Sequence, residues 1–175
     1  VVHLALPLME DLASSSGAAV ALGARDGTDM VYLANCRSMS PVTLQLNVGS
    51  RLPIWRTAMG LAYLADLSAE EREMRLNDIE RSDPKSISNA RELVARAVDE
   101  YQRQGFVCAI GTWFSYVNAV GTVFRPSDGT QRIAITCGGI VDIINEQVCR
   151  EVVGPQLNNI VARLSVLLPP ALPSI

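Results

Sequence analysis

The segment T-A-M-G-L-A-Y-L-A, residues 57–65, has the composition of a helix but almost no polar face. A helix at a protein surface usually presents one apolar stripe to the core and one polar side to solvent. This helix must therefore be buried on more than one side. We expect one side to lie on a sheet and another in a subunit contact. The preceding loop contains Gly49 and Pro53, and Trp55 and Arg56 stand at its exit.

Apolar segments in pairs, each pair separated by an Asp-Gly turn, predict two antiparallel hairpins. Residues 18–36 and residues 118–138 each contain such a pair, and Asp-Gly readily adopts the backbone angles of a tight turn. Residues 41–48 alternate apolar and polar side chains, which predicts a further strand with one face buried. Residues 105–113 predict another strand. Because hairpins pair neighbouring strands in opposite directions, the sheet is expected to be antiparallel.

Helical patterns precede, separate and follow these strands. Leu4, Leu8 and Leu12 recur every four residues before Gly17, which is placed to end a leading helix. Further helices are predicted from Thr57, from the capping box that Ser68 and Glu71 form, from about Asn89 to Gly105, and over residues 148–168 with a break at Gly154-Pro155. The order is helix, three strands, three helices, two or three strands and a terminal helix. This order predicts an α+β fold in which one antiparallel sheet is flanked by helices, as a single domain over residues 1–175.

Composition narrows the class of protein. The 175 residues are 49% hydrophobic and 19% charged, which is typical of one folded domain. The formal net charge is −3 and no run of Lys or Arg stands out, which argues against nucleic-acid binding by this segment alone. No apolar run reaches the roughly 18 residues of a membrane span, and the N-terminal stretch lacks the basic region of a signal peptide. We therefore expect no membrane contact and a cytoplasmic location.

The cysteines and the histidine argue against a metal site and against an enzyme. Cys36, Cys108, Cys137 and Cys149 are widely spaced in apolar runs, and His3 is the one histidine. Zinc sites need paired cysteines or several histidines, and a cysteine or serine nucleophile needs a nearby base. We predict no catalytic residue, no bound metal, no cofactor and a reducing compartment.

Two local features leave alternatives open. Gly138-Gly139 follows a predicted strand and would form either a simple tight turn or an exposed pair of N–H groups for an anion. Five of the nine aromatic residues fall within nineteen positions, namely Phe106, Trp113, Phe114, Tyr116 and Phe124. These rings line either a ligand pocket or the core. Trp113 and Phe114 cannot both enter one core if they are neighbours in a strand, because adjacent strand residues face opposite ways.

The segment V-G-S-R-L-P-I-W-R-T-A-M-G-L-A-Y-L-A, residues 48–65, resembles the signature of the effector-binding domain of IclR-type transcriptional regulators. D-G-T-D-M-V-Y-L, Q-G-F and D-G-T-Q-R-I-A-I-T-C-G-G, in this order, are similar to other segments of that family, and the resemblance extends from about Leu6 to Leu168. It implies a GAF-like fold that binds a small molecule on its sheet. It also implies that a winged helix-turn-helix half, absent from this chain, binds DNA as a dimer or a tetramer.

Positions that are polar in family members that bind small acids differ here. The resemblance places Ala109, Ala119, Thr136 and Gly138 where such members have an Asp, a Cys and two hydroxyl groups. The loop and helix carry Trp55 and Leu61 where the family usually has His and Lys, and Val123 replaces a proline. A pocket without these polar groups cannot compensate for the desolvation of pyruvate or glyoxylate. It suits a larger apolar or aromatic effector.

The predicted effector site combines the resemblance with the local pattern. Its residues are Leu44, Leu46, Trp55, Arg56, Ala58, Met59, Ala109, Trp113, Val117, Ala119, Thr136 and Gly138. The first N–H groups of the helix, at Ala58 and Met59, favour a carboxylate or carbonyl oxygen. Arg56 would either clamp a carboxylate or point to solvent or to an acidic neighbour.

Two functions of different classes follow. The first is a ligand-sensing domain that passes effector binding allosterically to the missing DNA-binding half. The alternative is an oligomerisation module whose pocket is closed and empty of ligand. A cavity of about 300 Å³ or more beside Met59, the lower limit for ligand sites, would favour the first, and a smaller one the second.

Overall fold

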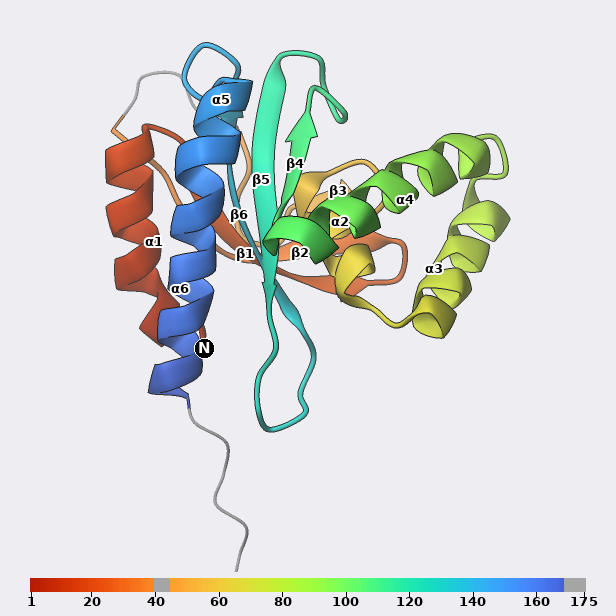
Figure 1. Ribbon diagram of the computed structural model, residues 1–175, viewed down its shortest axis with the longest axis horizontal. Helices are drawn as coiled ribbons and strands as arrows, with labels where there is room; N and C mark the ends of the chain where they lie inside the picture. Colours follow the sequence, from red (N-terminus) through yellow and green to blue (C-terminus); the bar gives the residue numbers. More distant parts are fainter. Residues whose placement is uncertain (40–44, 169–175) are drawn as a thin grey trace, which may run out of the picture.

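The computed structural model describes residues 1–39 and 45–168, and its centre is a six-stranded antiparallel sheet (Figure 1). The strands are β1 (Ala19–Asp26), β2 (Asp29–Cys36), β3 (Arg51–Pro53), β4 (Val107–Ile110), β5 (Val117–Phe124) and β6 (Ile133–Ile140). Their spatial order is β3-β2-β1-β6-β5-β4. The two predicted hairpins, β1–β2 and β5–β6, are confirmed, and β1 pairs with β6 to join them.

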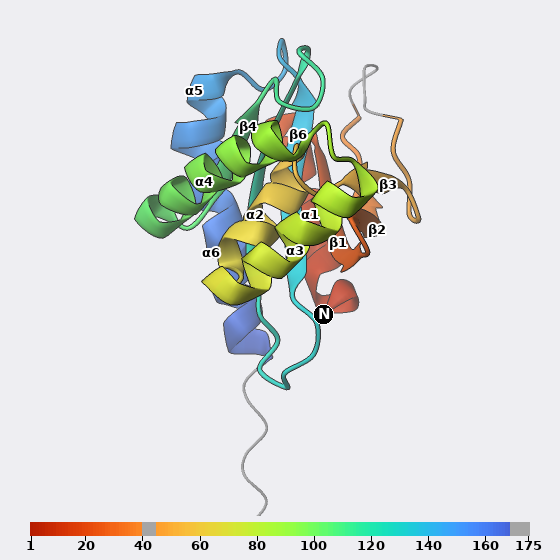
Figure 2. The ribbon, with the colours of Figure 1, turned by 90° about the vertical axis from the view of Figure 1, so that its right-hand side faces the viewer.

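Helices cover both faces of this sheet, which confirms the predicted α+β class. They are α1 (Val2–Ser16), α2 (Ala58–Asp66), α3 (Ala69–Ser82), α4 (Ile87–Gln104), α5 (Glu146–Val148), a π-helical turn η1 (Cys149–Val153) and α6 (Gly154–Leu167). α1 and α6 lie on one face, and α2, α3 and α4 lie on the other (Figures 1 and 2). Each face has its own hydrophobic cluster, so strand residues alternate between two cores.

Three helix boundaries agree with the sequence signals. Gly17 ends α1 with φ 72°, in the left-handed conformation that glycine adopts most readily. Ser68 and Glu71 form the capping box at the start of α3, since each side chain bonds the backbone N–H of the other. Gly105 ends α4 with φ 81°. These ends depend on contacts a few residues apart, which explains why they could be predicted.

The strand predicted for residues 41–48 is wrong in its described part. Residues 45–48 form no strand, and the third strand is the short β3. Leu44, a predicted site residue, lies outside the described residues. The loop is anchored through backbone contacts with β2, where the Gly49 N–H donates to the Tyr32 carbonyl at 2.8 Å. The alternating pattern is real in sequence, but pairing partners decide which residues join a sheet.

The strand that starts after Gly105 is shorter than predicted. β4 ends at Ile110, and Trp113 and Phe114 lie in the loop that leads to β5. The expectation that these two rings must face opposite sides is therefore wrong. The loop backbone turns at Gly111, with φ 65°, and brings the two ring centroids to 4.5 Å.

No break occurs at Gly154-Pro155. Val153 and Gly154 keep right-handed helical angles, and the wider turn of η1 joins α5 to α6. Proline is tolerated in the first turn of a helix, and a π turn alters the hydrogen-bond ladder where proline cannot donate. Gly154 packs against the Phe106 ring, where a side chain would overlap ring atoms.

Helix α2 is buried on all sides within one chain. All nine of its residues are buried, between the sheet on one side and α4 on the other (Figure 2). The sheet and α4 account for this burial without a subunit contact, so the inference of such a contact is not needed. α2 packs closely against β5 and against the segment before the helix because glycines lie at both contacts. A Cβ on Gly121 of β5 would overlap the Ala58 carbonyl oxygen, and one on Gly60 would overlap the Ile54 carbonyl oxygen.

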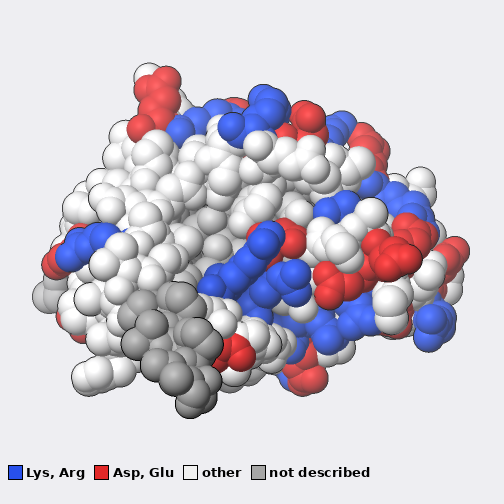
Figure 3. All heavy atoms as spheres, turned by 60° about the horizontal axis from the view of Figure 1, so that its bottom comes forward, with Lys and Arg blue, Asp and Glu red and all other residues white. Residues whose placement is uncertain are grey.

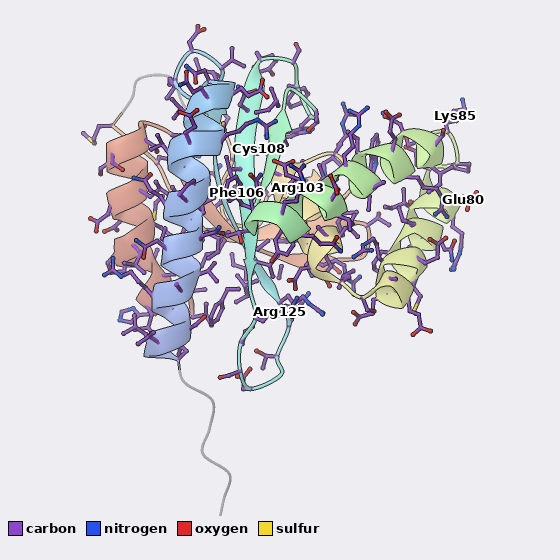
Figure 4. All side chains as sticks on the ribbon, in the orientation of Figure 1. Glu80, Lys85, Arg103, Phe106, Cys108 and Arg125 are labelled. Carbon is purple, nitrogen blue, oxygen red and sulfur yellow. The ribbon has the colours of Figure 1, made fainter. Side chains whose placement is uncertain are left out.

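The last residue of α2, Asp66, connects three elements. Its side chain is 2% exposed and accepts hydrogen bonds from Arg125, from Arg132 Nε at 2.8 Å and from the Tyr101 hydroxyl at 3.0 Å. Arg125, labelled in Figure 4, lies where the β5–β6 hairpin passes this end of α2. A buried carboxylate requires such partners. The network ties the hairpin and α4 to the helix.

Charge is distributed unevenly over the surface. On the face in Figure 3, charged side chains gather over α3 and α4, whereas the part formed by α1 and α6 is largely uncharged. Glu73 on α3 and Arg91 on α4 form one cross-helix pair, with 2.7 Å between Oε1 and Nη2. No helix among residues 1–39 and 45–168 is long and apolar enough to cross a membrane. The same residues contain no cluster of side chains with the composition of a metal site.

Replacing Gly60 by alanine tests the close seating of α2. Because the new methyl group would overlap backbone atoms of Ile54, Gly60→Ala should lower the free energy of unfolding by about 2 kcal/mol or more, measured by urea denaturation. The matched control is Gly139→Ala, also in the core, where a Cβ would meet its nearest neighbours at an ordinary 3.4 Å. Equal effects of the two substitutions would contradict the proposed seating.

Candidate functional site

A cavity lies between the start of α2 and the sheet. Its walls come from all six strands or their adjoining loops, together with the first turn of α2. The lining residues are Ala19, Tyr32, Asn35, Leu46, Leu52, Thr57, Ala58, Met59, Ala109, Thr112, Trp113, Val117, Ala119, Thr136 and Gly138. None of them carries a charged side chain. The cavity thus occupies the part of the fold where the predicted effector site was placed.

Most of the predicted site residues meet at this cavity. Leu46, Ala58, Met59, Ala109, Trp113, Val117, Ala119, Thr136 and Gly138 line it. Trp55 and Arg56 lie beside it but do not line it, and Leu44 is outside the described residues. Their role as effector contacts stays a prediction, since proximity to a cavity does not identify a ligand.

Sequence reasoning missed six lining residues: Ala19, Tyr32, Asn35, Leu52, Thr57 and Thr112. Alternation along β2 could have placed Tyr32 on the same face as Met30, because side chains two apart share a face. Thr57 carried the signal of an N-cap residue, a threonine directly before the apolar helix. Thr112 belongs to a loop whose course no local pattern reveals.

The start of α2 lines the cavity through Thr57, Ala58 and Met59. The Thr57 hydroxyl donates to the Pro53 carbonyl at 2.8 Å and accepts from the Gly60 N–H at 3.3 Å. The N–H groups of Ala58 and Met59 have no carbonyl partner within the helix. Together with the helix dipole they favour an oxygen atom of a bound molecule at this end.

Arg56 holds the loop of residues 111–116 beside the cavity. Its Nη2 donates to the Trp113 carbonyl at 2.8 Å, and its Nε donates to the Thr112 carbonyl at 3.4 Å. In return the Thr112 hydroxyl donates to the Arg56 carbonyl at 2.8 Å. The guanidinium also lies 5.4 Å from the centre of the Trp55 ring. Arg56 therefore links the loop to the segment that leads into α2, and no ion pair of Arg56 with an acidic side chain occurs among residues 1–39 and 45–168.

The aromatic residues divide between the loop and the core. The Phe114 and Tyr116 rings stack with centroids 5.5 Å apart and are half-exposed, and Phe114 also contacts Trp113. Phe106 and Phe124 are buried in the core on the α1 and α6 side of the sheet, where Figure 4 labels Phe106. Of these five aromatics, only Trp113 lines the cavity.

Most polar side chains on the cavity wall donate to backbone carbonyls: Thr57 to Pro53, Thr112 to Arg56 and Asn35 to Leu46. Tyr32 is 8% exposed. Burial raises the pKa of Tyr32 to about 12, because the neighbouring Thr136 side chain offsets only part of the effect. The wall is thus apolar with a few hydroxyl and amide groups, as ligand pockets usually are.

The cavity is small in the described conformation. Its volume is about 40 Å³, far below the roughly 300 Å³ at which ligand sites begin. Met59 lines the cavity, and its sulfur packs against Gly23 of β1. A molecule with an aromatic ring would require Met59 or the Trp113 loop to move.

Three larger hollows lie elsewhere, at about 290 Å³ between α1 and α6, about 340 Å³ on α6 and about 210 Å³ between α2, α3 and the residues that end β1 and precede β6. The first two are lined entirely by α1 and α6, and the third has charged walls that include Arg25, Glu71 and Arg132. They lack the convergence of several strands and a helix start that the smaller cavity has. We therefore take the smaller cavity as the candidate site.

Both interpretations of Gly138-Gly139 are wrong. The two glycines lie inside β6, where Gly138 pairs with Ala19 and Ala119 in the neighbouring strands. Their N–H groups therefore belong to the sheet and not to a turn. Gly138 contributes to the cavity because it has no side chain to fill it.

All four cysteines are buried free thiols, as their apolar surroundings predicted. Burial raises the pKa of each thiol, and for Cys137 the value is about 11. Thiols with raised pKa are poor nucleophiles because little thiolate forms.

Comparison with known proteins gives the family. The family described as bacterial transcriptional regulator IclR C-terminal matches residues 1–166. The chain therefore belongs to this family of transcriptional regulators, which confirms the resemblance noted in the sequence. It is a family of regulators and not of enzymes, in agreement with the expected lack of catalytic residues.

Individual relatives support the same assignment. The chain is 26% identical over 176 residues to the HTH-type transcriptional regulator TsaQ1/TsaQ2 of Comamonas testosteroni, covering 97% of this chain and 63% of that protein. An IclR-family regulator from Brucella abortus has a TM-score of 0.88 and 29% identity, over 95% of this chain and 63% of the other. The chain thus spans less than two thirds of these relatives.

A second similar structure is an isolated domain. It is the inducer-binding domain of a double mutant of the PobR transcription factor from Acinetobacter, in complex with 3-hydroxybenzoic acid. The TM-score is 0.77 at 18% identity, over 94% of this chain and 97% of that one. At this identity the similarity shows a shared fold.

Removing the Arg56 side chain should make the loop of residues 111–116 more mobile. In Arg56→Ala the carbonyls of Thr112 and Trp113 lose their donors, so amides of residues 111–117 should exchange about tenfold faster in hydrogen-exchange mass spectrometry. The control Arg103→Ala removes an exposed arginine on α4, labelled in Figure 4, and should leave this loop unchanged. Unaltered exchange in Arg56→Ala would show that the loop is held by other contacts.

Tyr32 should make stability depend on alkaline pH. Its pKa is about 12 in the folded protein and about 10 in the unfolded chain, so its contribution is complete below pH 10 and is lost between pH 10 and 12. Between pH 8 and 11 the wild type should lose about 1 kcal/mol more unfolding free energy than Tyr32→Phe, measured by urea denaturation. Other groups titrate in both proteins and cancel. Identical losses would contradict the buried environment of Tyr32.

Proposed function

We propose that this chain is the effector-sensing domain of a longer DNA-binding transcriptional regulator. The observation that carries the proposal is the cavity at the start of α2, which gathers residues from every part of the sheet. Membership of the IclR family supports a regulatory role. DNA binding belongs to a winged helix-turn-helix half of the intact protein, which would act in the cytoplasm as a dimer or tetramer.

The proposed effector is an apolar or aromatic molecule with a carboxylate. The uncharged wall favours a ring or alkyl group by burial of apolar surface, and the N–H groups of Ala58 and Met59 favour a carboxylate oxygen. The PobR inducer-binding domain, which shares the fold, is complexed with 3-hydroxybenzoic acid. Pyruvate and glyoxylate are disfavoured because they bury too little apolar surface to offset the desolvation of their polar groups in a cavity without a charged side chain.

Signalling requires that the effector binds one conformation better than another. The described cavity is too small for an aromatic acid, so a bound effector would favour a state with Met59 and the loop of residues 111–116 displaced. The loop is bonded to Arg56 at the start of α2, and Asp66 at the other end holds the β5–β6 hairpin. Displacement of the loop would thus bias the position of α2 and of the elements attached to it.

The alternative function is an oligomerisation module with a closed pocket. The volume of about 40 Å³ favours it, since it lies below the size of known ligand sites. In that case the side chains of Met59 and Trp113 always occupy the pocket, and the domain serves only to assemble the regulator.

Ligand binding separates the two functions. Benzoate, hydroxybenzoates and phenylacetate should include compounds that raise the melting temperature by roughly 5–10 °C at a hundredfold excess over Kd, whereas pyruvate and glyoxylate should not. Ala119→Leu places a larger side chain in the cavity and should abolish the shift. The control Ala95→Leu, on the exposed side of α4, should retain it. Native mass spectrometry of the same mixtures reports subunit number and bound ligand.

The outcomes are distinct. A shift with the aromatic acids that disappears in Ala119→Leu supports the sensing function. Oligomers without any shift would support the closed module. A shift with pyruvate or glyoxylate alone would contradict the proposed class of effector.

A further inference from the structure

Asn35, on β2, has a buried oxygen atom without a hydrogen-bond partner. Three side-chain atoms among the described residues share this property, namely Asn35 Oδ1, Asn118 Oδ1 and Arg75 Nε, and Asn35 is the one of these residues that lines the cavity. Arg75 Nε still lies 3.2 Å from Asp78, in an ion pair. Buried polar groups are nearly always paired, so the Asn35 oxygen calls for an explanation.

The orientation of the Asn35 amide is determined by its other end. Its Nδ2 donates to the Leu46 carbonyl at 2.7 Å. Exchanging the two amide atoms would bring two oxygens to that distance, which is repulsive. The atom left over is therefore the oxygen, a hydrogen-bond acceptor.

The other polar side chains of the cavity wall interact with groups of the protein. Thr57 and Thr112 donate to backbone carbonyls, and Thr136 neighbours the Tyr32 hydroxyl and affects its pKa. Asn35 Oδ1 therefore provides an unpaired acceptor, whereas the first N–H groups of α2 are donors without a partner within the helix. A molecule that satisfies both carries an acceptor such as a carboxylate and, separately, a hydroxyl or N–H group.

We propose that Asn35 selects effectors that carry a hydroxyl or N–H donor, through a hydrogen bond to Oδ1. The inference rests on the proposed effector-sensing function and adds the chemical class of the effector: an aromatic acid with a donor substituent. An effector with only acceptors would leave the Asn35 oxygen unpaired and lose the free energy of this bond. Discrimination against analogues that lack a hydrogen-bonding group is strongest where the protein partner is then left buried and unpaired.

Asn118 provides a matched control within the same sheet. It too is buried, donates from Nδ2 to a backbone carbonyl, that of Ile144 at 3.0 Å, and has an unpaired Oδ1. Asn118 does not line the cavity, because it alternates with Val117 and Ala119 along β5. The two asparagines thus differ in their relation to the cavity and agree in their chemistry.

The test compares matched benzoates by isothermal titration calorimetry. The probes are benzoate, the 3- and 4-hydroxybenzoates, 3-aminobenzoate and 3-methoxybenzoate, which has an oxygen but no donor. In the wild type at least one donor-bearing probe should bind about tenfold more tightly than benzoate, and 3-methoxybenzoate should not. Asn35→Leu should reduce this preference to less than about twofold, and Asn35→Ala provides a second variant should leucine disturb the strand. Asn118→Leu should retain the wild-type preference even if its stability falls.

Failure of the inference and failure of the proposed function give different results. If benzoates bind but donors bring no gain, or if the gain persists in both Asn35 variants, Asn35 does not select the effector while the sensing function stands. If no aromatic acid binds the wild type, the sensing function itself fails, and the selection by Asn35 fails with it.

Discussion

The close packing of α2 against the sheet determines how the rest of the structure is arranged. The helix can be apolar all round because β5 and β6 cover one side and α4 covers the other. It can lie so close to the sheet because Gly121 and Gly60 carry no side chains that would separate backbone from backbone. Its first turn lines the cavity together with residues of several strands, and its last residue, Asp66, forms hydrogen bonds with α4 and with the β5–β6 hairpin.

The cavity is a consequence of this arrangement. Small residues on the strands, such as Ala109, Ala119 and Gly138, leave space beside the first turn of α2, and Met59 and Trp113 partly fill it. The remaining space is bounded by groups of opposite hydrogen-bonding character, the helix N–H groups and the Asn35 oxygen. The hydrogen bonds of Arg56 connect the loop beside the cavity to the start of the helix. A ligand that moves the loop would therefore act on the same helix that holds the fold together.

Much of the fold could be predicted because its signals are local. Asp-Gly turns, the Ser68 capping box and Gly17 each depend on residues a few positions apart. The site was predicted partly from local patterns, which led to Met59 and Trp113, and partly from the family resemblance, which led to Ala109, Ala119, Thr136 and Gly138. Tyr32 and Asn35 were missed because alternation along a strand shows which residues share a face, but not what lies above that face. The loop of Trp113 was misjudged for the same reason.

The sequence by itself determined the element order, the antiparallel pairing and the burial of residues 57–65. These features follow from periodicity and turn chemistry, which depend on residues close together in the sequence. Only the tertiary structure decided what covers that helix, where the third strand lies, and that Arg56 bonds a loop more than fifty residues away. These features depend on the packing of segments distant in sequence. The unpaired oxygen of Asn35 is another such feature, because all the residues that surround a polar atom decide whether it has a hydrogen-bond partner.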